Sequence, residues 1–285
     1  MFYRQIKADL IICIWLLKNK YLIAVVLYGL FFLSFILQWN NYMSSFVQQS
    51  QITPTLGDLY FYLFGGCDPY VPGSDKVFVF PSQWILLVLY ICYLNLYHAY
   101  DNLQGSGVQL LLRNKSRKKW WLSKCLCVLV SVTLFLGIGI IVTSLLGLFC
   151  GMDMELYVHV GDMQSILKVY SLQIQKNQSY LFADCILVVF LTIVGVCLLQ
   201  LLLSLVLKPI LGFVFISIEL LLSSYFMHPI LIGNYLMLAR SELYVVDGLP
   251  IEFGLVSSVI LCIASVLCGT IYFNRMDIYG RGVAL

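Results

Sequence analysis

Apolar residues fill six long stretches of this chain, and shorter polar segments separate them. A helix needs about 20 apolar residues to cross the hydrocarbon core of a membrane, and a backbone in lipid must satisfy its own hydrogen bonds. The pattern therefore predicts an all-α membrane protein with six transmembrane helices, folded as a single domain over residues 1–285. The expected spans are residues 21–37, 83–99, 122–150, 181–207, 209–227 and 253–273.

The first 20 residues form a distinct amphipathic piece. Ile6, Leu10 and Leu17 recur at helical spacing, whereas charged residues such as Asp9 lie off that stripe. This pattern is typical of an interfacial helix that lies along the membrane surface. The alternative is that the same segment extends the first span.

Lysine and arginine are distributed unevenly between the two sides of a six-span topology. Thirteen of the 17 fall on the side of the two termini, including a dense cluster at residues 113–119. The other side holds Lys76, Lys168, Lys176 and Arg240. Because cytoplasmic loops are enriched in Lys and Arg, we expect both termini in the cytoplasm.

The outer connections differ in length and pattern. Residues 38–82 carry several glycines and prolines, which break regular helices, so no helix is expected there. Residues 151–180 have room for one helix around 163–175. Residues 228–252 are semi-apolar and predict short re-entrant helices in the outer leaflet.

The composition excludes a soluble protein. Apolar residues make up 61% of the chain and charged residues 11%, whereas a soluble domain carries about 25% charged residues. Most of the ten cysteines lie inside apolar stretches and act as small hydrophobes. Their spacing matches no zinc site, so no metal is expected. Cys67, Cys150 and Cys185 fall near one side of the membrane, and a disulfide between two of them is left open.

The connection between the second and third spans, residues 101–124, is too polar to lie in lipid, and its residue pattern is too regular for a flexible linker. It reads DNLQGSGVQLLLRNKSRKKWWLSK. Leucines give it an apolar side, two glycines allow a close approach, and a basic cluster precedes two interfacial tryptophans. On charge alone, an ordinary positive-inside loop with an aromatic anchor would explain it.

The spacing in this connection resembles the cytoplasmic signature of ABC-2 type transporter permeases. That signature has an acidic residue at the end of the second span, then Gly followed by Thr or Ser, then leucines, Ser-Arg and a final Lys. The matching residues here are Asp101, Gly105, Ser106, Leu110, Leu111, Leu112, Ser116, Arg117 and Lys124. Family members often have Pro two residues before the Ser, where this chain has Asn114, so we expect a softer bend.

The resemblance implies the membrane subunit of a bacterial ABC exporter in the plasma membrane. Residues 101–119 would form a coupling helix that sits in a groove of a separate ATPase subunit. The implied coupling residues are Asp101, Leu103, Gln104, Gly105, Ser106, Leu111, Leu112, Arg113, Ser116, Arg117, Lys118 and Lys119. This chain has no P-loop motif, so ATP and Mg²⁺ would be bound by the partner, and no cofactor is expected here.

The implied partners are two ABC ATPase subunits, a second permease copy or a related permease, and membrane lipid, with no nucleic acid. Permeases of this size and layout often serve the export of antimicrobial peptides, such as bacteriocins and lantibiotics, or self-protection against them. The expected substrate is therefore an amphipathic compound of that kind. The alternative is a channel or membrane scaffold that needs no ATPase.

Four polar residues inside the expected spans are candidates for a substrate pathway. Glu219 lies deep in an apolar stretch, where a charge is costly unless it faces a partner helix, a cavity or a cationic substrate. Ser223 lies nearby on the same span. Asn95 and Gln200 belong to the second and fourth spans, and helix packing is their alternative role. The chain has no H-E-x-x-H or G-x-S-x-G motif and no acid pair within one span, so we expect no enzymatic activity.

Overall fold

The computed structural model describes residues 2–45, 52–73, 78–98, 100, 116–172 and 178–275. Within this part of the chain every element is a helix, and pairing of extended residues is limited to two isolated β-bridges. The all-helical prediction is confirmed for these residues.

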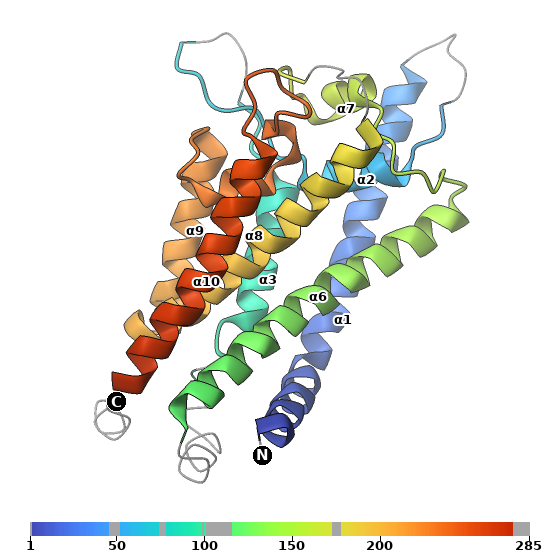
Figure 1. Cartoon of the computed structure of the whole chain (residues 1–285). Helices are drawn as coiled ribbons and strands as arrows, with labels where there is room; N and C mark the ends of the chain where they lie inside the picture. The colour runs from blue at the N-terminus through green and yellow to red at the C-terminus, as the bar shows by residue number, and fades with distance from the viewer. Residues whose placement is uncertain are drawn as a thin grey trace.

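The described apolar helices form one bundle (Figure 1). They are α1 (Phe2–Ser44), α3 (Ser82–Asn95), α6 (Arg117–Phe149), α8 (Gln178–Leu207), α9 (Pro209–Tyr225) and α10 (Ile251–Arg275). By length and composition, α1, α6, α8 and α10 could each cross a membrane. The other two are shorter, with 14 residues in α3 and 17 in α9.

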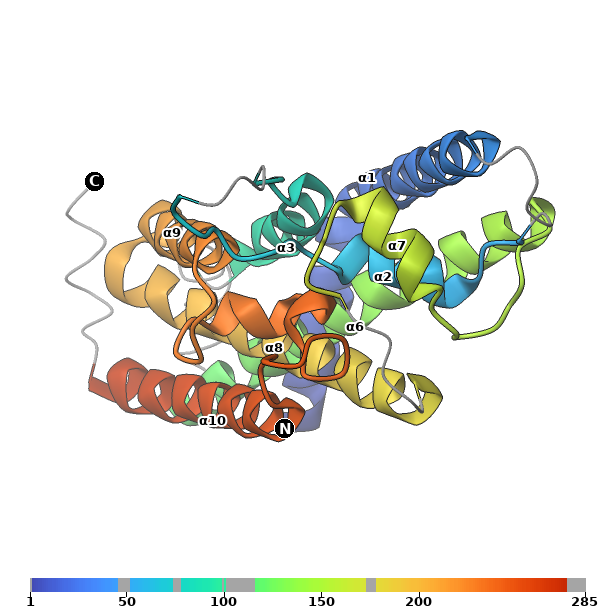
Figure 2. The same cartoon turned by 90° about the horizontal axis from the view of Figure 1, so that it is seen from above.

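Helix α8 lies at the centre of the bundle, in contact with α3, α6, α9 and α10 (Figure 2). On the outer helices, many apolar side chains point away from the core, and Leu30, Ile141 and Leu267 are each more than half exposed. Exposed apolar surface on this scale is typical of a membrane-facing protein.

The two ends of the bundle differ in architecture (Figure 1). One end, named the base here, holds the start of α1, the start of α6 and the end of α10. The other end, named the crown, holds α2 (Leu56–Phe64), α7 (Val160–Leu167) and the 3₁₀ helices η1 (Ile232–Leu236) and η2 (Leu238–Arg240).

Residues 2–20 belong to the same helix as the first expected span. Helix α1 is unbroken from Phe2 to Ser44, because no Gly or Pro occurs before Gly29. The separate N-terminal helix is therefore not present, and the segment extends the span, which was the alternative. Asp9, expected off the apolar stripe, is only 3% exposed.

Helix α2 contradicts the expectation that residues 38–82 hold no helix. Thr55 and Asp58 form a reciprocal capping box, in which each side chain accepts a hydrogen bond from the other residue's backbone N–H, at 3.1 and 3.0 Å. Gly57 does not break the helix. A Cβ there would lie 2.1 Å from the Tyr157 carbonyl oxygen, so glycine allows the two segments to touch.

The other connections follow the expectations more closely. The helix expected around 163–175 lies earlier, at Val160–Leu167, and ends where Lys168 adopts a left-handed φ of 56°. Short helices are present within 228–252, as η1 and η2. The tight turn between α8 and α9 is confirmed, since only Lys208 separates them and Pro209 takes the first helical position, where no N–H is needed.

Candidate functional site

The base of α6 is held to α1 by a buried ion pair. Lys124 Nζ lies 2.9 Å from Asp9 Oδ1, and the two side chains are 1% and 3% exposed. Ser123 Oγ donates to Asp9 Oδ2 at 2.6 Å, so both carboxylate oxygens have a partner. Lys124 also lies over the ring of Trp120, 5.4 Å from its centroid. Because a buried charge is costly without its counter-charge, this pair fixes the first turns of α6 against α1.

The same turns of α6 are also held to the end of α10. Arg117 donates to the carbonyl oxygens of Asn274 and Phe273 at 2.9 and 3.4 Å, where the helix dipole favours a cation. The Trp120 ring stacks on Phe273 with 4.6 Å between centroids. Trp121 is fully buried, and its indole N–H donates to a backbone carbonyl of α10 at 3.0 Å. The start of α6 is therefore anchored on two sides.

The predicted coupling segment lies mostly outside the described residues. The members there are Asp101, Leu103, Gln104, Gly105, Ser106, Leu111, Leu112 and Arg113. Of the others, Ser116 is the N-cap of α6, without a side-chain capping bond. Lys118 and Lys119 are exposed, whereas Arg117 contacts α10. The three cations, adjacent in the sequence, therefore differ in the structure: Arg117 links two helices, and the two lysines are exposed.

The predicted pathway residues Glu219 and Ser223 lie together on α9. Glu219 Oε1 accepts hydrogen bonds from Ser223 Oγ and from the backbone N–H of Gly233, each at 2.9 Å. Glycine at 233 permits this contact, because a Cβ there would lie 2.7 Å from Ser223 Cβ. The carboxylate therefore ties α9 to η1.

The other two pathway candidates bond to the backbone of α3. Asn95 Nδ2 donates to the Ile91 carbonyl within α3 at 2.9 Å, and Gln200 Nε2 donates from α8 to the Cys92 carbonyl of α3 at 3.0 Å. Both side chains are buried. Their hydrogen bonds go to the backbone of α3 and not to Glu219, so the structure does not join the four candidates into one site.

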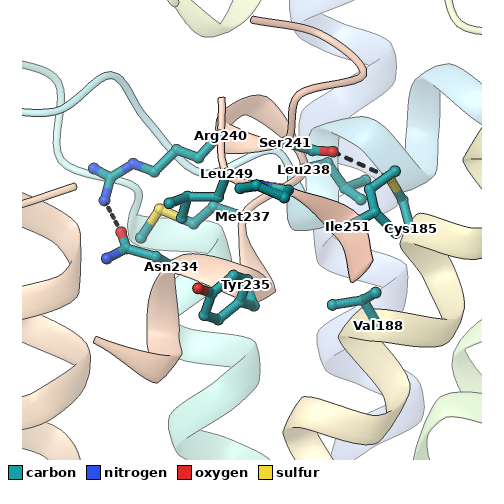
Figure 3. Close-up of a pocket in the computed structure, with 11 residues that line it drawn as sticks. Cys185, Val188, Asn234, Tyr235, Met237, Leu238, Arg240, Ser241, Leu249 and Ile251 are labelled. Atoms are coloured by element: carbon teal, nitrogen blue, oxygen red, sulfur yellow. Dashed lines mark hydrogen bonds between the residues drawn. The ribbon is translucent and has the colours of Figure 1, made fainter. Parts of the chain in front are cut away.

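A buried arginine, which sequence analysis placed in an outer loop, holds the crown together. Arg240 is 1% exposed. Its guanidinium donates to the carbonyls of Ser223, Ser224 and Cys67 and to Asn234 Oδ1. Figure 3 shows Arg240 and Asn234 pointing toward each other, while Ser241 points toward Cys185 of α8.

The contacts of Arg240 have a clear physical role. The last carbonyls of a helix have no partner within it, and a cation is favoured there. Two of the carbonyls bound by Arg240 belong to the final turn of α9. The sequence does contain a signal for this buried arginine. Arg240 directly follows the apolar run 235–239, and an arginine that is buried with such a run must find internal hydrogen-bond partners.

A second link in the crown, also missed from sequence, joins α2 to α7. Asp58 is fully buried, and its carboxylate accepts from the backbone N–H of His159 at 2.6 Å and contacts His159 Nδ1 at 2.7 Å. The hydrogen bond to Asp58 raises the pKa of His159 above its ordinary value of 6.5, and the nearby charges of Asp58, Asp162 and Asp153 act in the same direction, while burial opposes them. This link is therefore sensitive to pH.

Neither metal binding nor a disulfide is indicated by the described residues. Within them, no group of three or more His, Cys, Asp and Glu side chains could hold a metal ion. Cys67, Cys150 and Cys185 are free thiols. Cys67 donates to the Ser224 carbonyl at 3.4 Å, which places its side chain in the arginine network rather than opposite another thiol.

Comparison with known protein families gives a match over most of the chain. A family model described as "Protein of unknown function (DUF2705)" matches residues 70–279. No curated protein and no solved structure matches the chain significantly. The matched region takes in every helix from α3 to α10, including the anchored start of α6 and the buried arginine of the crown. Because the model covers well over half of the chain, this protein belongs to the DUF2705 family.

Proposed function

We propose that this protein is the membrane subunit of an ATP-driven ABC exporter in the bacterial plasma membrane. In this proposal all six apolar helices cross the membrane. At about 1.5 Å per residue, α3 and α9 are shorter than a hydrocarbon core of about 30 Å. A bilayer thins locally around short spans at modest cost. The packing of both helices against the central α8 supports placing them in the membrane.

The distribution of charge supports a cytoplasmic base. Exposed or partly exposed cations lie on the first half of α1 and at helix ends of the base. They are Lys7, Lys18 and Lys20 on α1, Lys118 and Lys119 at the start of α6, Lys208 between α8 and α9, and Arg275 at the end of α10. Carboxylates gather at the crown: Asp58, Asp68, Asp153, Asp162 and Glu242. Since Lys and Arg mark the cytoplasmic side, both termini and the connection at 101–119 would face the cytoplasm.

The observation that carries the proposal is the double anchoring of α6, directly after the segment that resembles a coupling helix. An ATPase that moves residues 101–119 would displace the start of α6. The Asp9–Lys124 pair would transmit this displacement to α1, and the contacts of Arg117 and Trp120 would transmit it to α10. Rigid-body movement of packed helices is a recognised way to switch access between two sides.

The substrate proposed is an amphipathic compound such as an antimicrobial peptide, on the strength of the resemblance. ATP and Mg²⁺ would be bound by the separate ATPase, and a second permease subunit would complete the pathway.

The test is recovery of a partner ATPase from native membranes in mild detergent. A P-loop ATPase is expected to co-purify with the chain. Lys118→Glu combined with Lys119→Glu should lower its recovery about tenfold, if each reversed charge costs about 0.7 kcal/mol. The matched control is Lys168→Glu, which reverses an exposed charge at the crown and should leave recovery unchanged. Reproducible absence of an ATPase would favour a channel or scaffold. Equal recovery from all variants would show that the ATPase does not bind at Lys118 and Lys119, which would contradict the proposed coupling site.

A further inference from the structure

An apolar pocket of about 380 Å³ lies below α2, between α1, α6 and α8. Its size falls within the usual range of small-molecule sites, roughly 300–1,000 Å³. The walls are formed by apolar and aromatic side chains, among them Leu63 and Phe64 of α2, Leu136 and Ile140 of α6, and Leu187 of α8. No charged side chain lines it.

One polar group in the pocket has no partner in the described part of the chain. Tyr28 lines the pocket and is 2% exposed, and its hydroxyl makes no hydrogen bond to any described residue. The ring lies against Gly139, another lining residue, where a Cβ would come within 2.4 Å of Tyr28 Cζ. Buried tyrosine hydroxyls normally have a partner. The half-buried Tyr60 of α2 also lines the pocket. The pocket therefore combines apolar walls with a buried hydrogen-bond donor, the Tyr28 hydroxyl, that no described residue uses.

The pocket opens toward the apolar outer surface of the bundle. Ile140 and Leu187, from its two long helical walls, are 52% and 46% exposed. Both helices are long and apolar enough to cross a membrane. A ligand would therefore enter from the lipid phase and not from water.

We propose that this pocket binds the acyl chain of a membrane lipid, with the ester carbonyl accepting a hydrogen bond from the Tyr28 hydroxyl. Walls without charge suit a hydrocarbon chain and disfavour an ionised headgroup. A neutral carbonyl supplies the acceptor that the tyrosine lacks, whereas a pure hydrocarbon would leave the hydroxyl unpaired. This inference goes beyond the proposed function, because lipid binding here requires neither an ATPase nor transport.

The experiment uses the full chain in phosphatidylcholine nanodiscs and a monoacylglycerol with a diazirine in its chain. After photolysis, mass spectrometry is expected to find saturable adducts on Leu136, Ile140 and Leu187. Tyr28→Phe should weaken binding about fivefold, the effect of one net hydrogen bond. A diazirine alkane of equal length, which has no carbonyl, should bind Tyr28→Phe and the unmodified protein equally.

The chain offers a matched control for each change. Tyr244 is also fully buried, and no described residue bonds to its hydroxyl, but it does not line the pocket, so Tyr244→Phe should leave binding unchanged. Leu187→Trp should fill the pocket and abolish saturable labelling, whereas Val206→Trp, at an exposed site on the same helix, should not. Unaltered labelling of both Tyr28→Phe and Leu187→Trp, or equal losses from Tyr28→Phe and Tyr244→Phe, would overturn the proposal.

Discussion

Breaking the ion pair at the base of α6 is expected to destabilise the protein far more than removing both of its charges. At 2.9 Å, two unit charges attract by about 6 kcal/mol at an effective dielectric constant of about 20. The cost of taking both ions out of water offsets most of this attraction. Losing one partner leaves the other, at 1% or 3% exposed, without a counter-charge, which costs about 3–5 kcal/mol.

Lys124→Met and Asp9→Leu are each expected to lower the free energy of unfolding by about 3–5 kcal/mol. The double variant should lie within about 1 kcal/mol of the unmodified protein, because it leaves no unpaired buried charge. The coupling energy of this double-mutant cycle should then be at least about 5 kcal/mol. The measurement is equilibrium denaturant unfolding in detergent micelles, followed by tryptophan fluorescence.

Lys118→Met serves as the control, because Lys118 is an exposed cation on the same helix. It should change the free energy of unfolding by no more than about 0.5 kcal/mol. A coupling energy below about 0.5 kcal/mol between the Asp9 and Lys124 changes would refute the reasoning, since the two side chains would then not share a buried site.

Three further changes test contacts elsewhere in the chain. The pKa of His159 is raised by its contact with Asp58, so this contact stabilises the fold fully below about pH 6.5 and loses that effect as pH rises through the folded-state pKa. Asp58→Asn should therefore flatten a plot of Tm against pH between about 5 and 9. An unchanged slope would contradict this assignment. Arg240→Met should cost about 3 kcal/mol in denaturant unfolding, because it leaves buried carbonyls without a donor, and a loss below about 1 kcal/mol would show that the carbonyls find other partners. Gly269→Ala should cost about 1–3 kcal/mol, because its Cβ would lie 2.1 Å from Trp121 Cζ2; an unaltered tryptophan emission spectrum would argue against that packing.

Local patterns predicted the long apolar helices well. The third expected span, residues 122–150, corresponds to α6 at Arg117–Phe149, and the turn at Lys208 lies where expected. Hydropathy is summed over neighbours along the chain, so no distant contact is needed to place such helices. The Thr-x-x-Asp pattern of the capping box at Thr55 and Asp58 is also visible in the sequence. The glycines and prolines around it nevertheless led to the wrong expectation that residues 38–82 hold no helix.

The burial of individual charged side chains could not be predicted from the sequence. The sequence pattern predicted Asp9 on the polar side of an amphipathic helix and Arg240 in an outer loop. Both side chains are buried in the structure. The partner of Asp9 is Lys124 on α6, and Arg240 binds Cys67 in a segment far away in the sequence.

The sequence by itself determined the membrane class, the apolar helices and the α8–α9 hairpin, because each depends on residues adjacent in the chain. Only the tertiary structure decided which polar groups are buried, that α6 is anchored to both α1 and α10, and that Tyr28 faces an apolar pocket. The reason is physical. The cost of burying a charge or a hydroxyl depends on the partners that packing brings to it, and those partners lie on other helices.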